Sequence, residues 1–153
     1  MTSEQAILDA LRLLLTVRVN QILDGMDDDG TSDGRWPPIT LDTGAALLAP
    51  PLCLAAMELT GGEAGEKDRI VRNETWHLSL VLDIHLPPAW RDAQEGCFRY
   101  AEAIAAALRE RPALGDRTAR FFLVKRLYRF PSHPGTGGTC RVQLGIDIAL
   151  EGL

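Results

Sequence analysis

Residues 74–87 read ETWHLSLVLDIHLP, and apolar side chains occupy every second position from Trp76 to Leu86. The positions between them are polar apart from Val81, and they hold His77, Ser79, Asp83 and His85. Because successive side chains of a strand point to opposite faces, this alternation predicts a strand with one buried face and one polar face. The stretch is about twice the average strand length of ~5–6 residues. We expect a partner, a lumen or a neighbouring subunit to lie against the polar face.

A helix and a loop are predicted on the N-terminal side of this strand. Residues 4–24 carry a stripe at helical spacing with one charged interruption, formed by Ile7, Leu11, Leu14, Leu15, Arg18 and Ile22. Thr2 and Gln5 have the spacing of a capping box, and Gly25 suits the C-terminal cap. Residues 27–38 combine aspartates, glycines and prolines, which predicts a long exposed loop.

The remaining elements follow from apolar patterns that Gly- and Pro-rich segments interrupt. Four strands are predicted, at 51–59, 70–86, 118–130 and 139–150. A second helix is predicted at 91–111, and flexible hairpin loops are predicted at 61–68 and 131–138. The fold class expected is α+β in a single domain over 1–153: one mainly antiparallel four-stranded sheet with two helices packed on one face, in the order α-β-β-α-β-β.

Charge is unevenly distributed along the chain, whose net charge is −5. Residues 1–75 carry an acidic excess, whereas the stretch from 117 to 141 contains no acid and holds Arg117, Arg120, Lys125, Arg126, Arg129 and Arg141. A basic zone on an acidic protein can bind phosphate. It can equally dock against the acidic part of another copy, which builds a head-to-tail ring.

The strand at 118–130 interleaves cations with aromatic rings, a composition that also occurs in nucleic-acid platforms. Strict alternation divides its apolar residues between two faces: Phe121, Leu123 and Leu127 on one, and Phe122, Val124, Tyr128 and Phe130 on the other. A strand that is partly apolar on both faces favours protein contact over nucleic-acid recognition. We therefore predict a protein interface that includes Arg120, Lys125, Arg126 and Arg129.

No group of side chains predicts catalysis. His77 and His85 are separated by roughly 26 Å along one strand at ~3.3 Å per residue, so they cannot share a ligand. Asp83 and His85 are about 7 Å apart by the same rise, and a third ligand would have to come from another strand. Asp27, Asp29 and Asp33 lack the glutamate of a calcium loop. We predict no catalytic residue, no cofactor, no metal site and no enzyme activity.

Two further expectations concern the cysteines and the membrane. Cys53, Cys97 and Cys140 are far apart in sequence and odd in number, which favours small buried apolar residues over disulfides or a zinc site. No run approaches the ~20 apolar residues of a membrane helix, and the N-terminus lacks the pattern of a signal peptide. Synthesis in the cytoplasm is expected.

The order of these segments resembles the tail terminator or tail-completion (minor tail) proteins of long-tailed bacteriophages and prophages. The resemblance covers most of residues 4–150 and rests on layout: a leading helix, an acidic loop, ETWHLSLVLDIHLP, YAEAIAAALRERPALGD, RFFLVKRLYRF and CRVQLGIDIAL. It includes a passage of helix, xPxLG and strand at Arg111–Gly115.

The resemblance implies a structural protein without catalytic residues. Such a protein assembles as a ring, commonly a hexamer, on the last ring of tail tube subunits, where it stops polymerisation and offers the attachment surface for the neck. It implies as partners the chain itself, a tail tube protein and a neck or head-completion protein, with no membrane and no sequence-specific nucleic acid, although DNA passes through the ring. The implied location is the bacterial host cytoplasm during assembly and then the virion tail. Alternatives are another oligomeric scaffold or neck protein, and a small enzyme or ligand-binding protein that uses the polar sheet face near Asp83 and His85.

Overall fold

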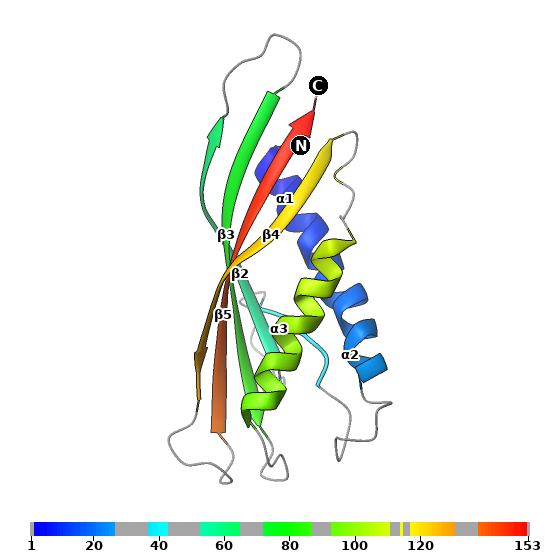
Figure 1. The fold of residues 1–153 in the computed structure, drawn as a ribbon, viewed down its shortest axis with the longest axis vertical. Coiled ribbons are helices and arrows are strands. Elements are labelled where there is room, and N and C mark those ends of the chain that lie inside the picture. The colour runs from blue at the N-terminus through cyan, green and yellow to red at the C-terminus, as the bar shows by residue number, and fades with distance from the viewer. Residues whose placement is uncertain are drawn as a thin grey trace.

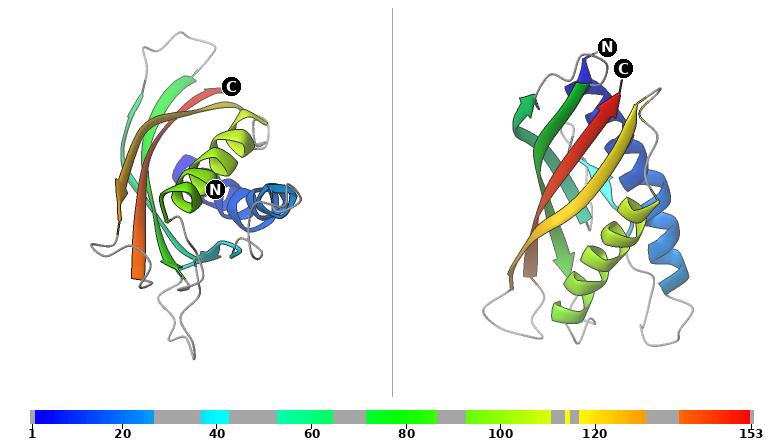
Figure 2. Two further views of the ribbon diagram at one scale, coloured as in Figure 1. Left: turned by 60° about the horizontal axis from the view of Figure 1, so that its bottom comes forward. Right: turned by 45° about the horizontal axis from the view of Figure 1, so that its top comes forward.

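The structure is a computed structural model that describes residues 2–26, 37–42, 53–64, 72–86, 93–110, 114, 117–130 and 138–152. One layer is a five-stranded sheet in the order β1-β2-β3-β5-β4, and the helices form a second layer against one face of it (Figures 1 and 2). The strands are β1 (Thr40–Leu41), β2 (Cys53–Ala64), β3 (Arg72–Leu86), β4 (Thr118–Arg129) and β5 (Gly138–Gly152). The helices are α1 (Ser3–Leu13), the π-helical η1 (Leu14–Val19), α2 (Asn20–Met26) and α3 (Ala93–Arg109). Among the helices that the structure describes, none is long and apolar enough to span a bilayer.

The prediction of a four-stranded, mainly antiparallel sheet in the order α-β-β-α-β-β is wrong. A fifth strand, β1, precedes β2 and pairs with it in parallel, with Thr40 opposite Leu54 and Leu41 opposite Ala55. The sheet is therefore mixed. A strand of two residues has no alternation that a sequence pattern could reveal, and its position depends on tertiary contacts.

Those contacts come from the helix layer. The backbone N–H of Ile39 donates to the side-chain oxygen of Asn20 over 2.7 Å, and the Asn20 amide donates back to the Ile39 carbonyl. The hydroxyl of buried Tyr100 donates to the Pro37 carbonyl. Ile39 itself is buried in the core. Together these bonds fix the segment that leads into β1.

The core lies between the sheet and the helices. β3 pairs with β2 and β5 in antiparallel registers that place Met57, Leu80 and Leu144 side by side. The apolar positions of β3 and β5 that alternate inward are buried: Leu78, Leu80, Leu82, Ile84, Cys140, Val142, Leu144, Ile146, Ile148 and Leu150. Each buried Leu or Ile side chain contributes about 1.5–3 kcal/mol of transfer free energy. All three cysteines are free and buried, which confirms that part of the prediction.

The N-terminal helix begins as predicted, with Thr2 as its N-cap accepting a hydrogen bond from the backbone N–H of Gln5. Past Leu14 the buried stripe departs from the α-helical spacing. Val19 and Leu23 are buried in place of Arg18 and Ile22, because a π-helical turn holds more residues than an α-helical turn. Arg18 instead lies outside the core, where its Nη2 is 2.6 Å from the Glu110 Oε1. The helix also runs through Gly25 to Met26, so Gly25 is not its cap.

Strand β4 contains a bulge that changes which side chains share a face. Its register with β5 shifts between Leu123 and Lys125, which leaves Val124 as an extra residue. Strict alternation therefore fails beyond Val124, and the predicted division of apolar residues is wrong there. Tyr128 lies on the helix side, where its ring meets Phe98 edge-on at 5.0 Å between centroids.

The predicted loops are described only at their ends. Strand β2 extends through Gly61–Ala64 into the segment expected as a loop at 61–68, and β5 begins at Gly138. Pro37 and Pro38 are described from the loop predicted at 27–38. Residues 27–36, 65–71 and 131–137, and with them Asp27, Asp29 and Asp33, lie outside the described residues.

Candidate protein interface

The face of the sheet that points away from the helices is called the outer face here. It is formed by the alternate residues of each strand whose neighbours point into the core. On β2 and β3 these are Leu54, Ala56, Glu58, Gly61, Glu63, Asn73, Thr75, His77, Ser79, Val81, Asp83 and His85. On β5 and β4 they are Thr139, Arg141, Gln143, Gly145, Asp147, Ala149, Glu151, Thr118, Arg120, Phe122, Lys125, Leu127 and Arg129. Polar and charged side chains predominate on β2, β3 and β5, as the alternation of β3 predicts.

Two ion pairs join the central strands of the outer face. Arg141 on β5 binds Asp83 on β3 through two contacts, Nε to Oδ1 at 2.9 Å and Nη2 to Oδ2 at 3.3 Å. His77 Nδ1 lies 2.7 Å from Asp147 Oδ1. The hydrogen bond to Asp147 raises the pKa of His77 above its ordinary value, partial desolvation opposes this, and the charges of Asp147 and Glu63 add to the rise. The Asp83 and Asp147 carboxylates at the centre of the face are thus each paired within the chain.

These pairs bear on the site considered near Asp83 and His85. The Asp83 carboxylate is occupied by the Arg141 guanidinium. Across the described ranges, no group of three or more His, Cys, Asp or Glu side chains is placed to hold a metal ion. Sequence reasoning missed the His77–Asp147 pair. Only the register of β3 with β5 brings the two residues together.

The charges at the two edges of the outer face differ from those at its centre. Glu58 and Glu63 lie on β2, and Arg120, Lys125 and Arg129 lie on β4. Within the part of the chain that the structure describes, none of these five makes an ion pair. One edge of the outer face is therefore acidic and the opposite edge is basic, and the charges of both are directed to solvent.

The four predicted interface cations do not share one face. Arg120, Lys125 and Arg129 lie on the outer face, opposite Ala149, Gly145 and Arg141 of β5. Arg126 pairs with Leu144, whose side chain is in the core, so it points to the helix side. There its Nη1 lies 3.2 Å from the Glu102 Oε1 of α3. The bulge at Val124 is the reason for this separation.

Strand β4 also exposes apolar side chains beside its cations. Phe122, Val124 and Leu127 are 49%, 58% and 46% exposed. Aromatic and arginine side chains are enriched at protein–protein interfaces. Together with Arg120, Lys125 and Arg129, these residues are called the β4 patch.

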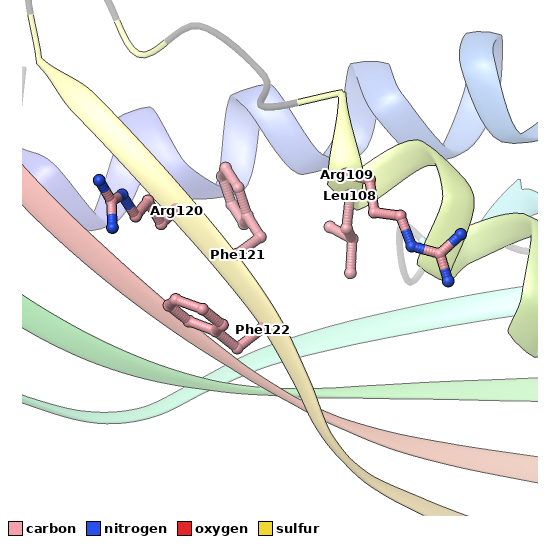
Figure 3. A pocket seen from close by; sticks show the side chains of 5 residues that line it. All are labelled: Leu108, Arg109, Arg120, Phe121 and Phe122. Carbon is pink, nitrogen blue, oxygen red and sulfur yellow. The ribbon is translucent and has the colours of Figure 1, made fainter.

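A hollow of about 260 Å³ lies between the C-terminal end of α3 and β4. Leu108, Arg109, Arg120, Phe121 and Phe122 line it. Figure 3 shows the Arg109 and Arg120 side chains extending in opposite directions, with Phe121 and Phe122 on opposite sides of the β4 ribbon. The two guanidinium groups do not converge on one ligand, so the hollow has the character of a surface groove at the margin of the β4 patch.

No family model matches the chain, and no curated protein matches its sequence.

Proposed function

We propose that this chain is a structural protein of a phage or prophage tail, and that it acts as the tail terminator. It caps the tail tube as a ring, ends polymerisation of the tube and provides the surface to which the neck or head attaches. Its partners are further copies of itself, the tail tube protein and a neck or head-completion protein. It is made in the bacterial host cytoplasm and ends in the virion tail.

One observation carries the proposal: the acids on β2 and the bases of the β4 patch, which form no ion pairs among the described residues, lie at opposite edges of one sheet face. A surface and its complement on opposite sides of one molecule produce a head-to-tail contact. Repeating that contact closes a ring when the rotation between neighbours divides a full turn. Complementary charges fix the orientation of the contact and disfavour other partners.

The resemblance in segment order suggests that such a ring belongs to a phage tail. The passage at Arg111–Gly115 and the strands that follow it belong to the layout shared with tail terminator proteins. The two supports are independent, since one rests on segment order and the other on charges at the edges of a folded sheet.

The test is disruption of the gene in its native phage or prophage, followed by electron microscopy of the particles produced on induction. We expect tails of uncontrolled length that carry no heads, and restoration of uniform, head-bearing tails by the wild-type gene in trans. Particles with normal tails and attached heads after disruption would overturn the proposal. Tails of normal length without heads would assign the chain to the neck instead.

A further inference from the structure

Both long edges of the sheet are open within the described residues. Among the described strands, β4 pairs with β5 alone. On the other side, β1 covers β2 only at Leu54 and Ala55, so the edge of β2 from Ala56 to Ala64 has no neighbouring strand among the described residues. An open strand edge presents unpaired backbone N–H and C=O groups, which are a template for another strand.

We infer that β4 of one copy pairs with β2 of the next copy, so that the sheet continues from subunit to subunit. This inference deepens the proposed ring and rests on it. β2 is antiparallel to β3, β3 to β5 and β5 to β4, so β2 and β4 run in opposite directions. Copies placed side by side with their helices on the same face therefore bring β4 against β2 as an antiparallel pair.

The register of the sheet aligns opposite charges across this contact. Glu58 lies at the same level as Lys125, because the pairs run Glu58–Ser79, Ser79–Gly145 and Gly145–Lys125. Glu63 lies at the level of Arg120 in the same way, through Thr75 and Ala149. When neighbours meet without stagger, each of these bases faces an acid of the next copy. Opposite charges at directly opposed positions stabilise a strand pair.

The bulges of the two edge strands match. β2 carries one extra residue between Leu59 and Gly61, and β4 carries one between Leu123 and Lys125. Two residues consequently separate Glu58 from Gly61 on β2, and two residues separate Phe122 from Lys125 on β4. Residues 56–64 of β2 in one copy and 119–127 of β4 in the next can therefore pair along their whole length without a further bulge. A bulge in only one of the two strands would put the residues beyond it out of register.

Other arrangements lose these pairs. A slip of one row in either direction leaves no base opposite an acid, because Lys125 then faces Ala56 or Gly61. A slip of two rows in one direction pairs Lys125 with Glu63 and Arg129 with Glu58, but it shortens the overlap from four rows to three, since the Leu54 row is covered by β1. Pairing of two β4 edges sets bases against bases, and pairing of two β2 edges sets acids against acids. The unstaggered β4–β2 contact is the arrangement that combines the longest ladder with opposite charges.

Cysteine cross-linking tests the contact and its register. The variant carries Glu58→Cys and Lys125→Cys in one chain, oxidised in purified, concentrated protein and in cells that produce the particle. Within one chain these positions are three strand spacings apart, about 14 Å, which is too far for a disulfide. Between copies their Cα atoms are ~4.5–5.5 Å apart. We expect a ladder of covalent multimers on a non-reducing gel, lost on reduction.

The matched control moves one cysteine by one row. A variant with Ala56→Cys and Lys125→Cys shifts the partner by two residues, or about 7 Å, and should form few multimers. The native cysteines contribute little background because all three are buried. Equal cross-linking of both variants, or no multimers in either preparation, would contradict the inference.

Charge exchange gives a second measurement. Lys125→Glu or Glu58→Lys alone should weaken self-association about tenfold or more, equivalent to ~1.4 kcal/mol. The two together in one chain should restore most of it, because each contact again joins opposite charges. Arg12→Glu makes the same charge change on α1, away from both edges, and should leave association unchanged. Lack of rescue in a folded double variant argues against the pairing.

The outcomes for interface and function are separable. If the cross-links form in the expected register but the tails stay normal after gene disruption, the interface is supported and the terminator function is rejected. If gene disruption gives tails of uncontrolled length but cross-links form at the offset positions only, the terminator function is supported and this interface is rejected.

Discussion

His77 on β3 and Asp147 on β5 lie directly opposite each other on the outer face, and the His77 Nδ1 is 2.7 Å from the Asp147 Oδ1. The contact joins the two central strands of the sheet at the level of Phe122 on β4. Both side chains are partly exposed, at 43% and 36%. A histidine in this position links the protonation of one side chain to the stability of the whole sheet.

We predict that Asp147→Asn lowers the pKa of His77 toward the ordinary value of about 6.5. The pair stabilises the fold more when His77 is protonated, because the imidazolium adds a charge attraction to the hydrogen bond. Because the folded-state pKa is raised, this contribution is complete below the ordinary pKa and is lost as pH rises through the higher folded value. The variant should therefore lose more stability relative to wild type at pH ~6 than at pH ~9. NMR titration of the His77 ring and urea unfolding at both pH values measure this.

Asp83→Asn is the matched control for that experiment. It removes the other cross-strand carboxylate, whose partner Arg141 stays charged throughout. Its effect on unfolding free energy should not change between the two pH values. An unaltered His77 pKa in the Asp147→Asn variant would show that the carboxylate does not set it.

Gly62 on β2 should not tolerate a side chain, although Gly61 should. A Cβ atom built on Gly62 comes within 2.2 Å of the Trp76 ring, whereas one built on Gly61 meets nothing within 4 Å. Gly62→Ala should cost about 1–3 kcal/mol, the range of overpacking. Gly61→Ala should be neutral or stabilise by up to ~1 kcal/mol, because alanine is less flexible in the unfolded chain. Urea unfolding of both variants compares them, and equal stabilities would contradict the position of the indole ring.

The three cysteine thiols should be unreactive in the folded protein. All are fully buried. Burial raises the pKa of the Cys53 thiol to about 12, with a further contribution from the negative charge of Asp83, so the reactive thiolate is scarce. Burial also raises the pKa of Cys97. A thiol reagent such as dithionitrobenzoate should modify them only at the rate of unfolding. Fast modification under native conditions would contradict the packing of α3 on β2 and β5.

Arg126 and Lys125 are adjacent in sequence but should behave differently. Lys125→Gln should weaken self-association, because it removes a cation from the outer face. Arg126→Gln should leave association unchanged and reduce stability by no more than about 1 kcal/mol, since its pair with Glu102 is largely exposed. Analytical ultracentrifugation and thermal unfolding separate the two effects. A larger association defect for Arg126→Gln would mean that β4 has no bulge at Val124.

The sequence predicted best where a single periodicity runs through a whole element. The alternation in β3 and in the last strand identifies the buried face of each without knowledge of their neighbours. It fails at Val124, because a bulge reverses the faces of all later residues and depends on the partner strand. It fails in the same way at Arg18, because the π-helical segment moves the buried stripe by one position.

The candidate interface was predictable in part for related reasons. The acid-free stretch identified the cations of β4, and three of the four lie on the outer face. That Arg126 points to α3 requires the bulge, and the His77–Asp147 pair requires the register between strands distant in sequence. The two residues of β1 follow a segment that is held by hydrogen bonds of Ile39 with Asn20 and of Pro37 with Tyr100, which no local pattern contains.

Thr60 is the extra residue of the β2 bulge, and Val124 is the extra residue of the β4 bulge. The numbers of residues in these two strands, which are far apart in the chain, therefore depend on each other. If β2 and β4 meet across subunits, a deletion of either residue alone shifts one side of the ladder and turns its later side chains to the wrong face. A deletion of both restores the match. Chains descended from this one should therefore gain or lose residues in these two strands together. That correlation would reflect contact between two copies of the chain, not contact within one molecule.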